Sequence, residues 1–232
     1  DRDVSGGEVK GYRHKLIPIF ADAIASDAEM AAAIQKHRAP HEAMLREVVG
    51  KTETTLYRRG NFNGTFDDLI CNAMMAERDT EIALSPGFRW GATLLPDDAI
   101  TWENITNATA ITYPNCYRNQ MTGGQLKEIL EDVADNIFHP DPYFQGGGDM
   151  VRIGGMGYAI DVGKPVGSRI SGLTHLKSGQ PIEASKTYTV SGWASINENT
   201  QGPPIWDVVA AHVARSGSVK IDPNSAVKVT GA

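Results

Sequence analysis

The sequence predicts a mixed α/β fold, in which helices accompany a sheet of mixed parallel and antiparallel strands. The clearest helix is expected over residues 124–138, where five apolar residues recur on one face: Leu126, Ile129, Leu130, Val133 and Ile137. Four short extended segments follow it, separated by glycine-rich turns, at residues 150–153, 158–162, 168–175 and 187–194. Because strands and helices do not alternate strictly, a mixed sheet fits this order better than a doubly wound parallel sheet.

The other elements are predicted from cap residues, turn residues and helical spacing. Ser26 and Glu29 have the spacing of a capping box, so a helix is expected from Ser26 to about Val48, bent near Pro40. Five further elements are expected: a helix from Thr65, a strand over 81–84, a short helix from Thr101, a strand over 110–118 and a last helix over about 204–213. Residues 1–20 are interpreted as a hairpin-like extended stretch.

Composition excludes several classes of protein. With 232 residues, 41% hydrophobic and 22% charged, the chain is expected to bury a sizeable core. Its formal net charge of −6 argues against binding to nucleic acid, which favours basic surfaces. No apolar run approaches the ~20 residues that span a bilayer. The two cysteines, Cys71 and Cys116, have no metal-site spacing and indicate neither a zinc module nor a disulfide framework.

Arg89 is the first candidate site residue. It lies just after Ser85-Pro86-Gly87, where the preceding strand must turn. A guanidinium at the end of a strand can offer two donors to a tetrahedral oxyanion such as phosphate, sulfate or a sulfonate. The structural alternative is a surface arginine packed over Trp90.

The second candidate is the stretch from Gly146 to Gly155, which places glycines on both sides of a short strand. Such glycines permit close approach by a ligand or another chain, and Asp149 and Arg152 could supply polar contacts. The alternative is a pair of tight turns around an ordinary strand. The stretch lacks the lysine and hydroxyl residue of a P-loop.

Two further stretches combine aromatic and polar residues, as ligand clefts commonly do. They contribute six candidate substrate-binding residues: Tyr113, Asn115, Tyr117, Arg118, Trp193 and Asn197. Burial in the core is the alternative for each aromatic residue taken singly.

No complete catalytic constellation is evident. The six histidines show no metalloprotease spacing, and we interpret them as solvated or capping residues. Asp67 and Asp68 are better explained as acidic residues at a helix N-terminus than as metal ligands. No nucleophile elbow is present. We therefore expect neither a catalytic residue nor a metal ligand in this chain.

The order of these features resembles the C-terminal domain of the 5'-nucleotidase family. The resemblance covers about residues 44–215. It rests on Val49-Gly50-Lys51-Thr52-Glu53, Leu69-Ile70-Cys71-Asn72-Ala73-Met74, Ile82-Ala83-Leu84 with its arginine-bearing turn, Ile100-Thr101-Trp102-Glu103-Asn104-Ile105, Met121-Thr122-Gly123-Gly124-Gln125-Leu126 and Tyr188-Thr189-Val190.

Two departures separate the chain from nucleotidases. Their turn usually reads Asn-Gly-Gly-x-Arg, whereas Ser85-Pro86-Gly87-Phe88-Arg89 keeps the arginine and loses the asparagine, so Arg89 alone carries over. Nucleotidases also stack the base between two phenylalanines, whose motifs are altered in residues 113–118 and missing from residues 195–202. With the string Gly147-Gly148-Asp149-Met150-Val151-Arg152-Ile153-Gly154-Gly155, these departures resemble the thiosulfohydrolases of bacterial thiosulfate oxidation.

That resemblance implies a periplasmic hydrolase with two manganese ions. The enzyme would release sulfate from a cysteine S-thiosulfonate on the SoxYZ carrier, whose cysteine-bearing arm would be its partner. The metal ligands would lie in the protein's own N-terminal metallophosphoesterase domain. Residues 1–25 would be the tail of that domain, residues 26–48 an interdomain linker helix, and residues 49–232 the substrate-binding domain. The chain alone is then expected to be inactive.

Two other functions stay open at this stage. The chain could be the substrate-binding domain of a true 5'-nucleotidase or a related phosphoesterase, with Tyr113, Tyr117 or Trp193 stacking on a base. It could also be a non-catalytic module that binds a protein tail in a glycine-lined groove.

Overall fold

The computed structural model describes residues 2–20, 22–197, 199–223 and 225–231. The chain divides into two compact units, Asp1–Ala43 and Met44–Ala232. None of the helices in the described residues is long and apolar enough to cross a membrane.

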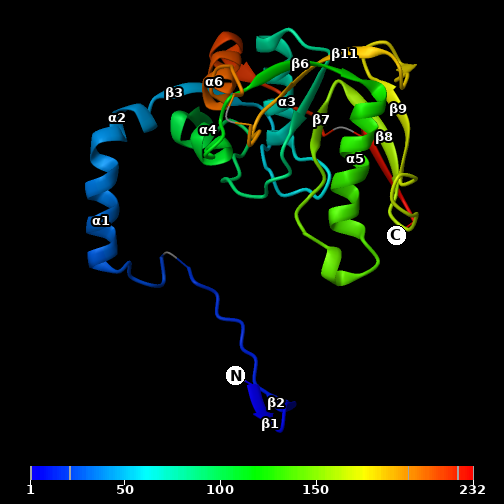
Figure 1. Ribbon diagram of the computed structural model, residues 1–232. Coiled ribbons are helices and arrows are strands. Elements are labelled where there is room, and N and C mark those ends of the chain that lie inside the picture. Colours follow the sequence, from blue (N-terminus) through cyan, green and yellow to red (C-terminus); the bar gives the residue numbers. More distant parts are fainter. Residues whose placement is uncertain (1, 21, 198, 224, 232) are drawn as a thin grey trace. The chain divides into compact units, whose positions relative to one another are not determined.

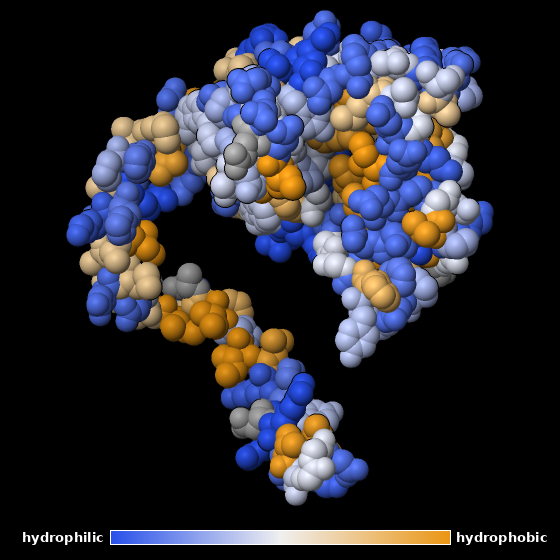
Figure 2. All heavy atoms as spheres, viewed as in Figure 1, coloured by the Kyte–Doolittle hydropathy of each residue, from blue (hydrophilic) through white to orange (hydrophobic). Residues whose placement is uncertain are grey.

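The first unit contains a hairpin and most of a helical segment. Strands β1 (Arg2–Ser5) and β2 (Glu8–Tyr12) pair antiparallel. Between the hairpin and the first helix, an extended stretch exposes Leu16, Ile17, Ile19 and Phe20, and Figure 2 shows hydrophobic residues gathered along it. Residue 21 lies outside the described residues.

The helix predicted from Ser26 to about Val48 is shorter at both ends. It comprises α1 (Ala28–Arg38), a 3-10 turn η1 (Ala39–His41) at the predicted bend, and α2 (Glu42–Leu45). The predicted capping box is wrong because the side chain of Asp27 caps α1, accepting from the backbone N–H of Met30 at 2.8 Å.

The second unit is a mixed α/β domain with three small sheets (Figure 1). Its helical elements are α3 (Thr65–Arg78), α4 (Trp102–Thr109), α5 (Gly123–Phe138), the 3-10 turn η2 (Pro142–Phe144) and α6 (Ile205–Ser216). Its strands are β3 (Val48–Thr52), β4 (Ile82–Ser85), β5 (Ala99–Thr101), β6 (Tyr117–Thr122), β7 (Arg152–Gly154), β8 (Met156–Asp161), β9 (Ile170–His175), β10 (Gln180–Pro181), β11 (Thr187–Gly192), β12 (Ser218–Val219) and β13 (Val227–Thr230).

All three sheets combine parallel and antiparallel pairs, which confirms the predicted mixed fold. The strand orders are β6-β11-β4-β7, β10-β9-β8-β13 and β12-β3-β5. In the first, β11 is parallel to β4, whereas β6 and β7 are antiparallel to their neighbours. In the others, β13 is parallel to β8 and β12 is parallel to β3.

Local sequence signals explain α4 and α5. Thr101 with Asn104, and Thr122 with Gln125, form complete capping boxes at the two N-termini. Leu126 and Leu130 on the predicted apolar face of α5 are fully buried. The helix predicted over 124–138 is therefore confirmed.

The strand predicted over 110–118 is wrong, because β6 begins only at Tyr117. The backbone N–H of Cys116 donates to the carbonyl of Pro203, and the N–H of Ile205 donates to the carbonyl of Pro114. These groups pair with the segment before α6, and Pro114 has no N–H to offer a sheet. The result is a loop anchored to a distant loop.

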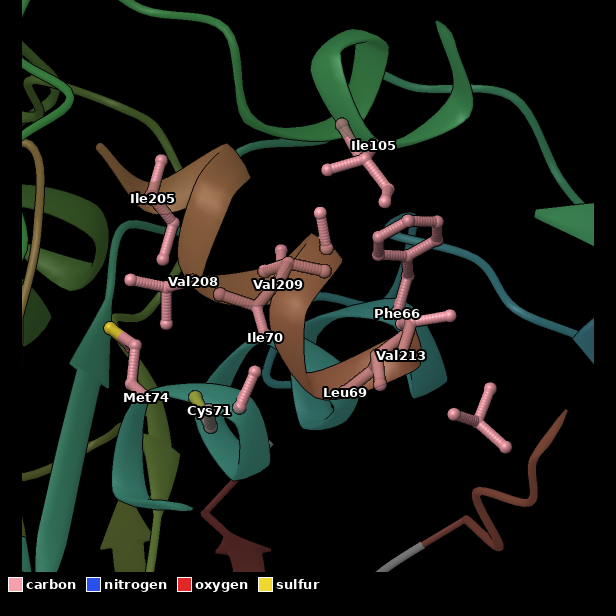
Figure 3. Close-up of a cluster of buried hydrophobic side chains, with 14 of the residues drawn as sticks. Phe66, Leu69, Ile70, Cys71, Met74, Ile105, Ile205, Val208, Val209 and Val213 are labelled. Atoms are coloured by element: carbon pink, nitrogen blue, oxygen red, sulfur yellow. The ribbon is translucent and has the colours of Figure 1, made fainter. Parts of the chain in front are cut away.

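Two apolar cores hold the domain together. One lies between α3, α4 and α6, where Phe66 and Ile70 of α3 meet Val209 of α6 and Ile105 of α4 (Figure 3). The other packs Leu126 and Leu130 of α5 against strands of the first two sheets. Every core residue named here is at most 1% exposed, so α3 is fixed on the face of the sheet that it covers.

We predict that neither cysteine reacts with a thiol reagent in the native protein. Cys71 and Cys116 are free and buried. Burial raises the pKa of the Cys71 thiol well above its ordinary value and raises the pKa of Cys116 to about 12. Since the thiolate is the nucleophile, labelling at pH 8 with Ellman's reagent should detect no thiol before unfolding and two after it. Rapid labelling of the native protein would contradict this packing.

Candidate functional site

At one edge of the sheet β6-β11-β4-β7, the ends of the four strands carry the predicted site residues. Because β11 and β4 are parallel and the outer strands antiparallel to them, the C-terminal ends of β4 and β11 meet the N-terminal ends of β6 and β7 at this edge. The register pairs Gly192 with both Leu84 and Tyr117, and Ser85 with Arg152. Four segments distant in the sequence therefore converge.

A chain of five alternating charges lies at this edge. Arg58 Nε donates to Asp67 Oδ1 at 2.7 Å, and Arg152 Nε lies 3.4 Å from Asp67 Oδ2. Asp149 Oδ2 is 3.0 Å from both Arg152 Nη2 and Arg89 Nε. The first four side chains are at most 3% exposed, whereas that of Arg89 is 54% exposed. The charge chain thus runs from the core to the surface.

Asp67 is the most deeply placed member. Burial raises the pKa of its carboxyl, and the guanidiniums of Arg58 and Arg152 oppose that shift. Within these five side chains, three guanidiniums face two carboxylates. One positive charge is therefore unbalanced, and Arg89 is the member that faces solvent.

Two contacts with other segments fix the turn after β4. Arg58 Nη2 donates to the carbonyl of Pro86 at 2.9 Å. Gly87 lies so close to the backbone of Asp149 and Met150 that an added Cβ would be 2.5 Å from the Met150 carbonyl oxygen. The glycine is thus required for the turn to dock on the segment before β7.

Aromatic stacking fixes the rest of the turn. Phe88 stacks on Trp90 with ring centroids 3.8 Å apart and meets the edge of Trp193 at 5.9 Å. The Arg58 guanidinium lies 5.7 Å from the Phe88 ring centroid. Trp90 is therefore covered by Phe88, while Arg89 turns to Asp149. The alternative of an arginine packed over Trp90 does not describe this turn.

A pocket of about 580 Å³ opens beside β6 and β11. It brings together four of the predicted residues: Tyr117, Arg118, Trp193 and Asn197. Seven others complete the lining: Asn119, Met121, Ala194, Ser195, Asn199, Thr200 and Gln201. Residue 198 lies outside the described residues.

Tyr117 and Trp193, the two aromatic residues that line this pocket, are packed into its wall and do not form open stacking surfaces. Trp193 is 4% exposed and its indole N–H donates to Ser85 Oγ at 2.8 Å. Tyr117 lies across Gly192, where an added Cβ would meet its hydroxyl. Burial raises the pKa of Tyr117 to about 12. Both side chains are therefore packed into the edge of the sheet.

A second cavity, of about 420 Å³, adjoins Arg89 and Asp149. Its other lining residues are mostly apolar: Asn61, Phe62, Ile137, Phe138, Gly148, Met150, Val162 and Val229. Arg89 thus borders an apolar hollow while its own guanidinium stays partly open to solvent.

Three predicted residues do not face either cavity. Arg152 is buried in its ion pairs, so direct contact with a substrate would require those pairs to break. Asn115 donates to the carbonyl of Thr200 and thereby fixes the loop around the first pocket. Tyr113 is partly exposed, and its carbonyl accepts from the N–H of Ala194. We assign Arg152 to the support beneath Arg89.

Arg118 lines the first pocket, and two of its nitrogens are engaged elsewhere. Its Nε donates to the carbonyl of Arg78 at 3.0 Å, and its Nη2 donates to the carbonyl of Asp79 at 3.2 Å. These carbonyls lie at the C-terminus of α3, where a cation is favoured by the helix dipole. Arg118 therefore ties β6 to α3.

Sequence reasoning missed Arg58 and the buried partners of Asp67. Asp67 and Asp68 do lie in the first turn of α3, as predicted from the macrodipole. That interpretation is incomplete, because Asp67 also pairs with two arginines. The only local signal was an arginine nine residues before an aspartate, which has no diagnostic value by itself.

The described residues contain no group of three or more His, Cys, Asp or Glu side chains that could hold a metal ion. Two histidines have side-chain partners of another kind: His175 with Ser178 Oγ at 2.9 Å, and His212 with Glu77 at 3.7 Å. Burial lowers the pKa of His212.

A family model described as the 5'-nucleotidase C-terminal domain matches residues 48–208. This chain belongs to the 5'-nucleotidase C-terminal domain family. The match includes the charge chain and most of the first pocket. No curated protein matches the chain.

Solved structures extend the comparison over the full chain. The sulfate thiohydrolase SoxB of Thermus thermophilus, solved with glycerol, is 31% identical, with a TM-score of 0.90 over 100% of this chain and 44% of SoxB. A 5'-nucleotidase precursor, also from Thermus thermophilus, is 19% identical, with a TM-score of 0.76 over 97% of this chain and 48% of its own. The Haemophilus influenzae NAD nucleotidase is 18% identical, with a TM-score of 0.64 over 88% and 41%.

These comparisons confirm the predicted family and the predicted resemblance to SoxB. The two nucleotidases, at under 25% identity, support the fold alone. The chain spans less than half the length of each of these three structures.

We predict that Asp67→Asn destabilises the domain by about 3–5 kcal/mol, because it takes the carboxylate partner from the buried guanidinium of Arg58 and leaves Arg152 with Asp149 alone. Asp68→Asn is the matched control, since it removes a charge from the same helical turn and leaves the pairs of Asp67 with Arg58 and Arg152 in place, so a smaller loss is expected. Urea unfolding of both variants measures the difference. Equal losses would show that the ion pairs contribute little beyond the helix dipole.

Proposed function

We propose that this chain is the substrate-recognition domain of a thiosulfohydrolase, which releases sulfate from a cysteine S-thiosulfonate on the SoxYZ carrier. The observation that carries the proposal is the similarity to SoxB over the entire chain, at 31% identity and a TM-score of 0.90. The values for the 5'-nucleotidase are 19% and 0.76.

Arg89 is the residue best suited to the sulfonate. Its guanidinium is half exposed, carries the unbalanced charge of a buried ion-pair chain and sits on a turn fixed by Gly87 and Phe88. A guanidinium can donate two parallel hydrogen bonds to the oxygens of a tetrahedral anion. In this role Arg89 binds the sulfonate before reaction and the sulfate after it.

The reaction itself breaks one S–S bond. Water attacks the sulfonate sulfur, the new S–O bond completes sulfate, and the departing sulfur stays on the carrier cysteine as a persulfide that takes up a proton. The chain's contribution is to hold the sulfonate oxygens and line the approach, with Tyr117, Trp193 and Asn197 forming the wall of the 580 Å³ pocket.

The two manganese ions expected for such an enzyme do not fit the described residues of this chain, which contain no suitable ligand cluster. We therefore place them on an N-terminal metallophosphoesterase domain, and we expect the chain alone to be inactive. A periplasmic location belongs to the same proposal. Contact between the carrier arm and the glycine-flanked stretch from Asp149 to Arg152 is also part of it.

A 5'-nucleotidase function is the second candidate, favoured by the matching family model. Base stacking in this family needs open aromatic faces. Trp193 is buried against Phe88, and Tyr117 packs across Gly192, which leaves Tyr113 as the exposed ring among the three residues considered. The geometry therefore favours an oxyanion carried on a slender chain over a nucleobase. A non-catalytic peptide-binding module is the third candidate function, and no observation favours it.

We predict that Arg89→Ala lowers kcat/KM for sulfate release by at least ~10-fold, about 1.4 kcal/mol of transition-state stabilisation. The measurement uses the full-length parent, thiosulfonate-loaded SoxYZ and equal manganese loading. Arg215→Ala is the matched control, because Arg215 is also an exposed arginine paired with an acid, the partly buried Glu77 on α3. Equal turnover in wild type and Arg89→Ala would remove Arg89 from the site.

Nucleotide hydrolysis by the same parent separates the first two candidates. We expect no release of phosphate from nucleoside monophosphates under conditions in which sulfate is released from the loaded carrier. Release of phosphate without release of sulfate would establish the nucleotidase function instead.

A further inference from the structure

We infer that Asp149 is a positioning residue, which holds Arg89 in the orientation that binds an oxyanion, with Arg152, Asp67 and Arg58 as its buried support. This inference rests on the proposed role of Arg89 and extends it to four residues that touch no substrate.

The geometry gives Asp149 an unusual double engagement. One oxygen, Oδ2, lies 3.0 Å from Arg89 Nε and 3.0 Å from Arg152 Nη2. Because Arg152 is itself buried and bound to Asp67 and to the carbonyl of Gly60, the Asp149 carboxylate cannot follow a moving Arg89. Asp149 is therefore a fixed anchor for a half-exposed side chain.

The engaged atom decides what Arg89 offers. The ion pair with Asp149 is made at Nε, the nitrogen nearest the backbone. A guanidinium held at Nε can still present both terminal NH₂ groups to a bidentate ligand. An arginine side chain otherwise loses rotamer entropy when a ligand fixes it. Holding it in advance removes part of that cost from binding.

The same anchor also carries a charge that opposes the ligand. A carboxylate beside the binding site repels sulfate, so a purely electrostatic view predicts that its removal tightens anion binding. The positioning view predicts the reverse. The sign of the effect therefore separates the two explanations.

The test is a sulfate titration of the 232-residue chain. Binding is monitored through the ¹H–¹⁵N resonance of Arg89 Nε, which is assigned by its loss in Arg89→Lys. We expect Asp149→Asn to weaken sulfate binding about tenfold, because the guanidinium of Arg89 loses the charged contact that orients it before sulfate binds. Glu77→Gln is the control, because it removes the same charge from an acid paired with an exposed arginine elsewhere. It should leave the affinity unchanged. Unchanged or tighter binding in Asp149→Asn overturns the inference.

A double-mutant cycle shows whether Asp149 acts through Arg89. In an Arg89→Ala background, Asp149→Asn should have no further effect on sulfate affinity, because the residue that it positions is absent. Since this background has no Arg89 resonance, sulfate affinity is measured by isothermal titration calorimetry in all four proteins of the cycle. An equal loss in both backgrounds would indicate a merely structural role and would overturn the inference.

A measurement on the wild-type protein tests the inference without requiring any variant to fold. The Arg89 Nε resonance should be distinct from the averaged position of freely exposed arginines and should persist at pH 7. An averaged resonance overturns the inference. None of these measurements uses SoxYZ, so failure of sulfate release by the parent would defeat the proposed function while leaving this result intact.

Discussion

A buried carboxylate between two buried guanidiniums is the constraint on which the edge of the sheet depends. Asp67 cannot be buried without partners, and its partners come from the loop before α3 and from the start of β7. Arg58 then also binds the carbonyls of Pro86 and Ala108, at the ends of β4 and α4. One ionic centre therefore fixes five segments of the chain relative to one another, and loss of one partner would leave an unpaired buried charge.

The sheet topology turns this local centre into a site. The parallel pairing of β11 with β4 places Trp193 beside Ser85 although they are 108 residues apart, and the indole N–H bonds to the serine hydroxyl. Phe88 then meets the edge of Trp193. The wall of the 580 Å³ pocket and the turn that carries Arg89 are thus joined through two aromatic rings, so that a change on one side is transmitted to the other by direct packing.

What could be predicted from the sequence follows from the range of the interactions. The helix after Thr122 was predicted because its apolar face is encoded within sixteen residues. The strand predicted before Tyr117 failed because Cys116 pairs with Pro203, and no local pattern reveals a partner 87 residues away. Arg89 was found from a turn signal, whereas its anchoring by Asp149 and the role of Arg58 depend on tertiary contacts. The family resemblance supplied the fold, but the buried ion pairs had to come from the structure.

Four arginines lie near this edge, and their environments assign them different tasks. Arg58 and Arg152 are buried and neutralised by Asp67 and Asp149, so they act as structural cations. Arg118 is partly exposed, and two of its nitrogens are bound to the carbonyls at the end of α3. Arg89 differs from these three because its half-exposed side chain is paired with a buried carboxylate, that of Asp149. Under the proposed function, an oxyanion that approaches this edge therefore meets a guanidinium whose acidic partner is fixed.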